Sequence, residues 1–340
     1  MIMEVYTRNN KRTLALGFVG TGWIGRNRMG VLLSSGIATA AAIAEPYPEH
    51  AAQALEMAPE AEIMEEASEI YQNTDIDGVV IATPSALHAC QALEALNAGK
   101  AVFCQKPLGR TAGEVEAIVA ASRRADQYLS VDLSYRYTRA FEEIYKIVSS
   151  GKIGKVYAVD LVFHNAYGPD KEWFYDLNQS GGGCVMDLGI HMIDLALLSL
   201  GFPDTHVISS ILFSKGEVVG PQEGKVEDYA KVTLQTSEGT TIGLDCSWHS
   251  PAGREAVIEA VFYGTQGGAA FKNSNGSFYD FTAERYNGTT TEVIETGPDA
   301  WSGRAGIAWA MQVLGGAGYD AIGAAEYLKT AKIIDSIYGR

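Results

Sequence analysis

The run Leu14-Ala-Leu-Gly-Phe-Val19, followed by Gly20-Thr-Gly22-Trp-Ile-Gly25 and a helix-compatible stretch to Ser35, decides the fold of the first half of the chain. It has the pattern GxGxxG between a strand and a helix, which is the context that dinucleotide binding needs. The first glycine makes the turn, the second lets the backbone approach a pyrophosphate, and the third packs the helix on the strand. Backbone amides and the helix dipole favour the anion. The predicted dinucleotide contacts in this turn are Gly20, Gly22, Trp23, Ile24 and Gly25.

An acidic residue follows the next predicted strand, which covers residues 39–44. This residue is Glu45, and it stands twenty residues after Gly25. A carboxylate at that spacing accepts hydrogen bonds from the ribose diol of an adenosine. A 2′-phosphate there would meet like charge, and residues 46–50 include no arginine. The pattern therefore predicts NAD rather than NADP. The alternative interpretation is a glutamate that merely ends a strand.

Strands and helices continue to alternate up to residue 134. Further strands are predicted at residues 78–82, 101–104 and 128–133, and further helices at residues 85–98 and 112–126. This alternation predicts an α/β domain with a doubly wound parallel sheet over residues 1–134. Ligands bind at the carboxyl ends of such strands. The residues at or just past those ends are Gly20, Glu45, Thr83, Lys106 and Asp132.

The second half, residues 135–340, predicts an α+β domain with an open, mainly antiparallel sheet. Helices are expected at residues 141–148, 304–314 and 319–338, and strands at residues 226–236, 241–248, 255–263, 269–272 and 291–295. His164, Asn165, Tyr167 and Trp173 are expected in a loop. Helices on one face of the sheet leave its other face uncovered. We therefore expect a homodimer or homotetramer that forms through this sheet.

Three polar residues interrupt the apolar run 185–200, which follows three glycines at 181–183. They are Asp187, His191 and Asp194, at the spacing that places them on one face of a helix. Buried charges need partners or a purpose, so the pattern favours a polar stripe that faces a cleft. The alternative is a core histidine braced by an aspartate. A closed zinc site wants four ligands and only Cys184 lies nearby, so no metal is predicted.

Composition excludes several classes of function. The 340 residues carry a formal charge of −15, which argues against nucleic-acid binding. No apolar run approaches the ~20 residues of a membrane span, and residues 1–12 lack the apolar core of a signal peptide. The four cysteines (Cys90, Cys104, Cys184 and Cys246) show no CxxC spacing and lie in apolar surroundings. These features predict reduced thiols and a cytoplasmic protein.

Four motifs together give a family resemblance over essentially the whole chain. They are GTGWIG at 20–25, IATP at 81–84 with His88, AGKAVFCQKP at 98–107, and GGGCVMDLGIHMID at 181–194. In this order they resemble the Gfo/Idh/MocA oxidoreductases, which couple a Rossmann domain to an open α/β sheet domain. The resemblance implies NAD(P)-dependent oxidation or reduction of a sugar, cyclitol or related polyol.

The resemblance also implies roles for single residues. The lysine of the family's Glu-Lys-Pro motif, and the aspartate and histidine of its Asp-x3-His motif, match Lys106, Asp187 and His191, the implied catalytic set. The expected cofactor contacts outside the glycine turn are Glu45, Thr83, Pro84, His88, Gln105 and Lys106. One departure is that Gln105 replaces the family's usual glutamate. It removes a negative charge beside Lys106, which makes the ammonium form less favoured.

The expected chemistry is hydride transfer from a secondary alcohol. His191 suits the base, Asp187 shares the proton transfer or fixes a hydroxyl, and Lys106 stabilises the alkoxide. Tyr135, Arg136, His164 and Trp173 join Asp187 and His191 as expected substrate contacts, with packing at a domain seam as the equal alternative for Trp173. A neutral substrate is expected because arginines do not cluster. The competing classes are a redox-neutral glycosidase or lyase that keeps its NAD, and a non-catalytic NAD(H)-binding regulator.

Overall fold

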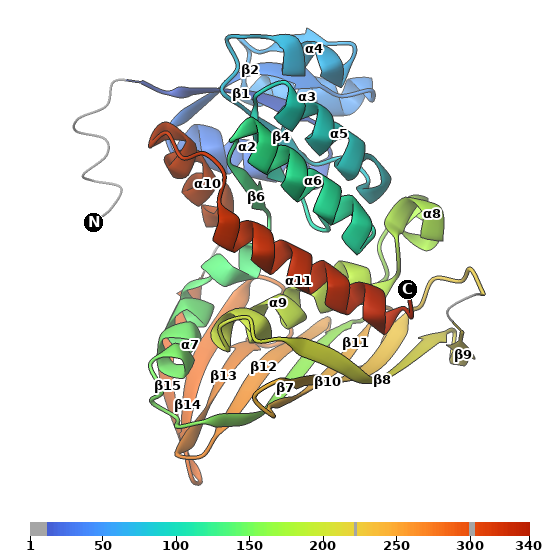
Figure 1. The fold of residues 1–340 in the computed structure, drawn as a ribbon, viewed down its shortest axis with the longest axis vertical. Helices are drawn as coiled ribbons and strands as arrows, with labels where there is room; N and C mark the ends of the chain where they lie inside the picture. Colours follow the sequence, from blue (N-terminus) through green and yellow to red (C-terminus); the bar gives the residue numbers. More distant parts are fainter. Residues whose placement is uncertain (1–11, 221–222, 299–302) are drawn as a thin grey trace.

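The computed structural model describes residues 12–220, 223–298 and 303–340, which form two β-sheets with helices around and between them (Figure 1). The fold class predicted from the sequence, a doubly wound parallel sheet followed by an open and mainly antiparallel sheet, is confirmed. The prediction that residues 1–12 lack a signal peptide concerns a stretch of which residues 1–11 lie outside the described part.

The first sheet has six parallel strands in the order β3-β2-β1-β4-β5-β6. They are β1 (Leu14–Val19), β2 (Ala38–Ala44), β3 (Glu62–Met64), β4 (Gly78–Ile81), β5 (Ala101–Cys104) and β6 (Leu129–Val131). Strands covered on both faces read as continuous apolar runs, which explains the sequences of β1, β4 and β5. The strand order reverses between β1 and β4, and a ligand crevice lies at the carboxyl ends of strands at such a point.

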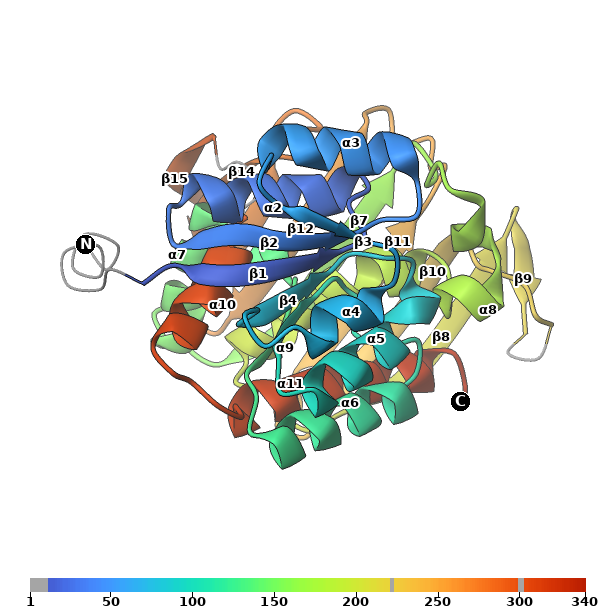
Figure 2. The same cartoon turned by 90° about the horizontal axis from the view of Figure 1, so that it is seen from above.

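Helices cover both faces of this first sheet (Figure 2). The helices on one face are α2 (Trp23–Ser34), α3 (Pro48–Met57) and α10 (Arg304–Leu314). The helices on the other face are α4 (Ala67–Gln72), α5 (Ser85–Asn97) and α6 (Ala112–Ala125). In α10, Trp309 is 1% exposed and stacks on Phe103 of β5, so this helix completes the core of the first sheet. One helix of the predicted domain 135–340 therefore packs on the first sheet. The domain boundary after residue 134 stays a prediction.

The second sheet has nine strands in the order β15-β14-β13-β12-β7-β11-β10-β8-β9, and only the pair β7–β11 is parallel. They are β7 (Val156–Asn165), β8 (Thr205–Ser214), β9 (Glu217–Val219), β10 (Tyr229–Thr236), β11 (Thr241–Ser247), β12 (Ala256–Gly264), β13 (Gly267–Asn273), β14 (Asp280–Asn287) and β15 (Thr290–Pro298). The helices packed on one face are α7 (Arg139–Ser149), α9 (Ile190–Ser199) and α11 (Ala321–Ile337). Figure 1 shows α9 and α11 between the two sheets.

Several elements were missed in the sequence. The missed elements include α3, β3, α4, β7, β8, β9 and β14, and also short helices between residues 134 and 180. The most consequential is β7, the central strand, because His164 and Asn165 were expected in a loop and instead end this strand. Its alternation of buried Leu161 and Phe163 with half-exposed neighbours is the pattern of a strand with one covered face.

The predicted apolar helix after the glycines begins with a π-helical turn. The short helices of this region are η1 (Ser134–Tyr137), η2 (Glu172–Tyr175), α8 (Leu177–Ser180) and the π-helix η3 (Val185–Gly189), which runs directly into α9. The segment Leu177–Ser199 is apolar enough by composition to cross a membrane, but 89% of its most apolar window is buried inside the protein. It is the central helix of the core, and it gives no indication of a membrane span.

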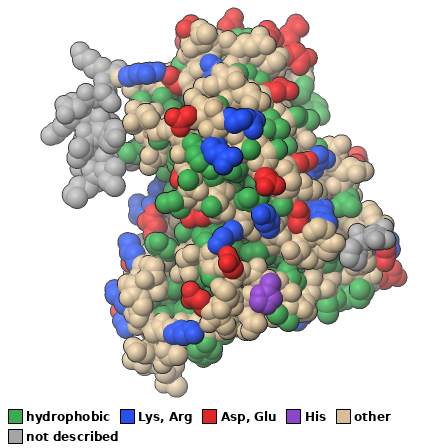
Figure 3. Space-filling view, viewed as in Figure 1, with side chains coloured by type: hydrophobic (Ala, Val, Ile, Leu, Met, Phe, Trp, Pro, Cys, Tyr) green, Lys and Arg blue, Asp and Glu red, His purple; other side chains and the backbone are tan. Residues whose placement is uncertain are grey.

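The surface and the cysteines bear on two further sequence predictions. On the face shown in Figure 3, basic and acidic side chains are interspersed. The four cysteines are free thiols; Cys104, Cys184 and Cys246 are buried, whereas Cys90 is exposed. The expectation of apolar surroundings is therefore wrong for Cys90, which lies on the outer side of α5.

Candidate active site

The glycine turn after β1 has the close packing and the open side that a dinucleotide needs. Gly20 has a φ of +82°, and a Cβ on it would lie 2.8 Å from the carbonyl oxygen of Ala82. A Cβ on Gly25 would lie 2.2 Å from the carbonyl oxygen of Gly20, so the turn and the first turn of α2 are in direct contact. A Cβ on Gly22 would meet nothing within 4 Å, which leaves the turn open there. Trp23 is 59% exposed beside this opening.

Glu45 lies at the end of β2, and its carboxylate holds the glycine turn. It accepts hydrogen bonds from the backbone N–H groups of Thr21 (2.6 Å) and Tyr47 (3.0 Å), and its side chain is only 4% exposed. His50 Nδ1 lies 3.8 Å from Glu45 Oε1. The turn, Glu45 and the ends of β4 and β5 therefore lie along one edge of the first sheet. Together they fit a dinucleotide with its pyrophosphate at the start of α2.

Lys106 and Asp187 form a contact between the two halves of the chain. Lys106 Nζ donates to Asp187 Oδ1 at 2.5 Å and to the Asp187 carbonyl oxygen at 2.8 Å. The second carboxylate oxygen of Asp187 accepts a hydrogen bond from Trp248 Nε1 at 3.0 Å. The two charged side chains are 18% and 16% exposed, so the pair is half-open to solvent. Lys106 follows β5, and Asp187 lies in the π-turn η3, a kind of irregularity that is frequent at functional sites.

His191 lies one turn further along the same helix and is almost completely buried. It is 4% exposed, and its Nδ1 is a buried atom without a hydrogen-bond partner. The ring packs edge-on against Tyr135, with centroids 4.8 Å apart. Burial, followed by the positive charges of Lys106 and Arg28, lowers the pKa of His191 well below its usual value near 6.5. The imidazole is therefore held neutral.

Gln105 connects to a buried ion pair behind Lys106. Arg28 of α2 and Asp132, just past β6, are 2% and 1% exposed, and Arg28 Nε donates to Asp132 Oδ2 at 2.6 Å. Gln105 Nε2 donates to this same oxygen. Asp132 Oδ1 is buried without a partner. Gln105 is thus a neutral donor to Asp132, which already carries the negative charge of the ion pair with Arg28.

His88 is one of the expected cofactor contacts. Its ring is 1% exposed, and its nitrogens lie 2.7 Å from the carbonyl oxygens of Pro107 and Thr83. The ring thus lies between the loops after β4 and β5, and its one N–H in the neutral form donates to one of these two carbonyl oxygens. His88 connects the two loops that carry Thr83, Pro84 and Lys106. Its expected contact with the cofactor stays a prediction.

The three residues of the predicted polar stripe on the central helix contact different partners. Asp194, 1% exposed, binds Arg136 through Nε at 2.6 Å and Nη2 at 2.5 Å, and Glu326 of α11 binds Arg136 Nη1 at 2.7 Å. Arg136 therefore ties the central helix to α11 with its guanidinium held by two carboxylates. The expected contact of Arg136 with substrate stays a prediction. The expectation that Asp194 orients its neighbours agrees with the contact.

The remaining predicted substrate residues lie in different places. Tyr135 is 3% exposed and packs beneath His191. His164 pairs with Ser247 and Val257 on the opposite face of the second sheet from Phe163, because successive strand residues alternate. The substrate contact expected at His164 therefore stays a prediction. Trp173 is half-buried in η2 and stacks on Phe174 at 3.8 Å, and its role stays a prediction.

Tyr175 and Trp248 lie beside Asp187 and were missed as site residues. Tyr175 is 46% exposed, packs its ring edge-on against Trp248 at 5.6 Å, and has its hydroxyl 3.2 Å from His249 Nε2. His249 is exposed and has a φ of +55°, which is rare for a residue with a Cβ. The alternation of β11, which puts Ile242, Leu244, Cys246 and Trp248 on one face, was the available signal for Trp248. Within the described ranges, no group of three or more acidic, cysteine or histidine side chains could hold a metal ion.

Comparison with known families agrees with this architecture. The model of the oxidoreductase family with an NAD-binding Rossmann fold matches residues 14–133, and the model of the GFO/IDH/MocA C-terminal domain matches residues 141–270. The chain belongs to the Gfo/Idh/MocA family. Its members are oxidoreductases with an NAD-binding Rossmann domain, and the family resemblance seen in the sequence motifs is confirmed.

Individual relatives of this Gfo/Idh/MocA protein act on sugars or cyclitols by name. An inositol 2-dehydrogenase of Acidiphilium cryptum is 31% identical over 68% of this chain and 67% of its own length. The uncharacterized oxidoreductase YrbE of Bacillus subtilis is 30% identical over 61% of this chain, and the match spans only 58% of that relative. The crystal structure of an aldose-aldose oxidoreductase from Caulobacter crescentus superposes with a TM-score of 0.82 at 22% identity, covering 96% of this chain and 97% of that one.

Proposed function

We propose that this protein is an NAD-dependent dehydrogenase that transfers a hydride between nicotinamide and a secondary alcohol or ketone of a neutral sugar, cyclitol or related polyol. The observation that carries the proposal is the contact of Lys106 with Asp187 beside the buried His191, at the carboxyl edge of the dinucleotide sheet. Family membership supports the reaction class. The names of relatives such as inositol 2-dehydrogenase support the substrate class.

The residues present fit NAD as the cofactor. Gly20, Gly22 and Gly25 form the turn for the pyrophosphate, and Glu45 is placed for the adenosine ribose. Trp23, Ile24, Thr83, Pro84, Gln105 and Lys106 complete the proposed cofactor edge. When bound, NAD supplies the hydride acceptor. A 2′-phosphate would meet the buried carboxylate of Glu45, so we infer that NAD binds more tightly than NADP.

The side chains of the site divide the proton chemistry among them. His191 is neutral, and a neutral imidazole can accept the hydroxyl proton of the alcohol. Lys106 supplies an ammonium group to the oxygen as negative charge develops on it. Asp187 holds that ammonium group, and Trp248 fixes the other carboxylate oxygen. Removing the ammonium or the imidazole is expected to lower turnover by roughly 10²–10⁴-fold.

The surroundings of the site favour a neutral substrate. A phosphate would need free arginines in a cluster, because bidentate donors hold it best. Arg136 is held by Asp194 and Glu326, and Arg110 pairs with Glu114. Near Asp187 lie the aromatic rings of Tyr175 and Trp248, with Trp173 in the same segment as Tyr175. Such rings stack on the apolar faces of sugar rings while hydroxyl groups take the hydrogen bonds.

The test is a panel of polyols with NAD. We would incubate the purified protein with NAD and myo-inositol, D-glucose or methyl glucosides, and follow NADH absorbance beside analysis of the products. Stoichiometric NADH with an intact carbon skeleton is the expected result, and Lys106→Ala should reduce it strongly. Release of methanol from the glycosides without net NADH would instead show a redox-neutral glycosidase. Tight NAD binding with no reaction on any compound would leave a binding protein.

We also infer that a second copy of the chain covers the outer face of the second sheet. Ile211 and Tyr263 are 45% and 36% exposed, and their register with Lys231 and Ala158 places them on the face that the helices leave open. Light scattering after size exclusion tests the expected homodimer or homotetramer. The buried free thiols fit a reducing compartment, which supports a cytoplasmic location.

A further inference from the structure

The three glycines at 181–183 lie against three other residues of this same protein, two through their side chains and one through its backbone. A Cβ on the first glycine would lie 2.6 Å from the Cβ of Arg110, and one on the second would lie 2.2 Å from the hydroxyl of Tyr338. A Cβ on the third would lie 1.8 Å from the carbonyl oxygen of Glu227. These distances are too short for any side chain other than hydrogen. The glycines are thus required because other parts of the chain approach the start of the central helix.

Glu227 lies buried at the amino-terminal end of this helix. It is 2% exposed, and its carboxylate accepts hydrogen bonds from the backbone N–H groups of Gly183 and Val185, both at 2.9 Å. The hydroxyl of Tyr338 donates to it at 2.8 Å. A carboxylate at this position satisfies backbone donors that the first turn leaves without helical partners. Burial raises the pKa of Glu227, and the hydrogen bonds from Val185, Tyr338 and Gly183 act against that rise.

The end of α11 extends this contact to Asp187. Tyr338, 8% exposed, also accepts a hydrogen bond from the backbone N–H of Met186 at 3.2 Å. Met186 directly precedes Asp187 in the π-turn. The Tyr338 hydroxyl therefore connects Glu227 to the backbone immediately before the residue that binds Lys106.

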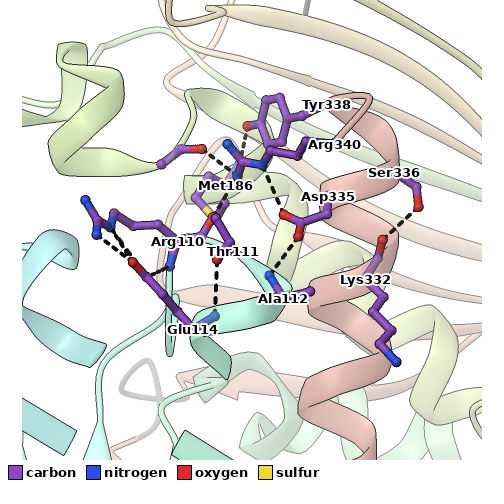
Figure 4. A network of polar contacts seen from close by, with 11 residues as sticks. Arg110, Thr111, Ala112, Glu114, Met186, Lys332, Asp335, Ser336, Tyr338 and Arg340 are labelled. Carbon is purple, nitrogen blue, oxygen red and sulfur yellow. Dashed lines mark hydrogen bonds and ion pairs between the residues drawn. The ribbon is translucent and has the colours of Figure 1, made fainter. Parts of the chain in front are cut away.

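The same end of α11 also holds the loop that follows Lys106 (Figure 4). Arg340 Nη2 donates to the carbonyl oxygens of Arg110 at 2.7 Å and Gly181 at 2.8 Å. Asp335 accepts from the backbone N–H of Ala112 at 2.8 Å and from Arg340 Nε at 3.0 Å. The loop 107–112 and the segment 181–186 are thus bound to one short stretch of α11.

We propose that Glu227 and Tyr338 are positioning residues of the hydride-transfer reaction, which fix Asp187 opposite Lys106. This inference rests on the proposed function. Lys106 and Asp187 come from segments 81 residues apart, and their 2.5 Å contact persists only if both segments keep their relative position. A displacement of about 1 Å in a reacting group is enough to lower a rate by roughly 10²-fold. Tyr338 and Glu227 do not themselves touch substrate in this proposal.

The first experiment compares Tyr338→Phe with Ser336→Ala by hydrogen–deuterium exchange. Ser336 lies in the last turn of α11, two residues before Tyr338, and is exposed. Among the described residues its hydroxyl bonds to the Lys332 carbonyl at 2.8 Å and to no site residue, so its variant is a matched control. We expect the peptide spanning 181–190 to exchange faster in Tyr338→Phe than in the parent protein. In the control variant we expect its exchange rate to be unchanged. This readout needs no turnover, so it stands even if the polyol panel shows no reaction. Unchanged exchange in 181–190 would overturn the proposal.

The second experiment measures kcat, KM and NAD affinity at 25 °C with a polyol that the panel identifies. Tyr338→Phe should lower kcat by about 10-fold or more, leave the Kd for NAD within about twofold, and lose no further rate when added to Asp187→Asn. Glu227→Gln places an amide N–H against a backbone N–H and should show the same pattern. A role in stability alone would lower Tm and leave kcat per folded molecule unchanged, and that result would overturn the proposal.

Discussion

Replacing Gln105 with glutamate restores the family's usual residue, and we expect it to destabilise this protein. The new carboxylate would face Asp132 Oδ2, which already binds Arg28. Two negative charges about 3 Å apart repel by about 5.5 kcal/mol at an effective dielectric constant near 20. Protonating one carboxyl group at pH 7 avoids this repulsion at a cost of about 3.7 kcal/mol, for a reference pKa near 4.3. Protonation is the cheaper of the two, so it sets the cost, and the positive charge of Arg28 offsets part of it. The free energy of unfolding should therefore fall by about 3 kcal/mol.

This mechanism has a pH signature that a steric effect lacks. One carboxyl group in the folded variant has a pKa raised above its unfolded value, so the folded state binds the extra proton. Stability is then lost as pH rises above about 4.3, by up to about 1.4 kcal/mol per pH unit. Urea unfolding should therefore give a loss of about 3 kcal/mol at pH 7 and about 1 kcal/mol at pH 5. Gln105→Leu, which removes the hydrogen bond without adding charge, should cost about 1 kcal/mol at both pH values. Equal stability of Gln105→Glu and the parent at pH 7, or a loss independent of pH, would refute the reasoning.

Three other predictions concern the reaction, the cofactor and the fold. Burial and nearby cations lower the pKa of His191, so kcat/KM for alcohol oxidation should show no loss centred near pH 6.5. Such a loss would contradict the neutral imidazole. His191→Asn should lower kcat by roughly 10²–10⁴-fold. Fluorescence titration should show NAD binding about 5- to 150-fold more tightly than NADP, and Glu45→Gln should narrow that ratio. Asp194→Asn leaves the buried Arg136 with Glu326 alone and should lower stability by about 3 kcal/mol while NAD affinity stays unchanged; an unaltered Tm would count against this.

The parts of the fold that could be predicted are those specified by local pattern. The strands β1, β4 and β5 are continuous apolar runs, and glycine, proline or lysine stands within three residues after each of them. Their alternation with helices along the chain is that of a dinucleotide-binding sheet. The strand β7 was harder, because it lies at the centre of the second sheet and still presents Asp160 and His164 on an open face. Its polar residues resemble a loop until the neighbouring strands are known.

The site residues show the same division. Lys106, Asp187 and His191 stand in motifs, whereas the identity of their partners depends on contacts between distant segments. The helical spacing of Asp187, His191 and Asp194 suggested one shared environment. In the structure Asp187 lies in the π-turn and bonds to Trp248, whereas Asp194 binds Arg136. The roles of His88 and His164 could not be read from spacing either, because burial against carbonyl oxygens and the choice of sheet face are tertiary facts.

The glycine run 181–183 shows how the position of Asp187 depends on contacts that no local motif marks. From sequence alone, three glycines before a polar helix indicate close approach of backbone or ligand. The structure assigns that approach to Arg110, Tyr338 and the backbone of Glu227. Each comes from a different element, and Tyr338 lies more than 150 residues further along the chain. A helix that must present Asp187 to a lysine from another sheet needs its first turn held from several directions. The glycines at that turn allow Arg110, Tyr338 and Glu227 to come close enough to hold it.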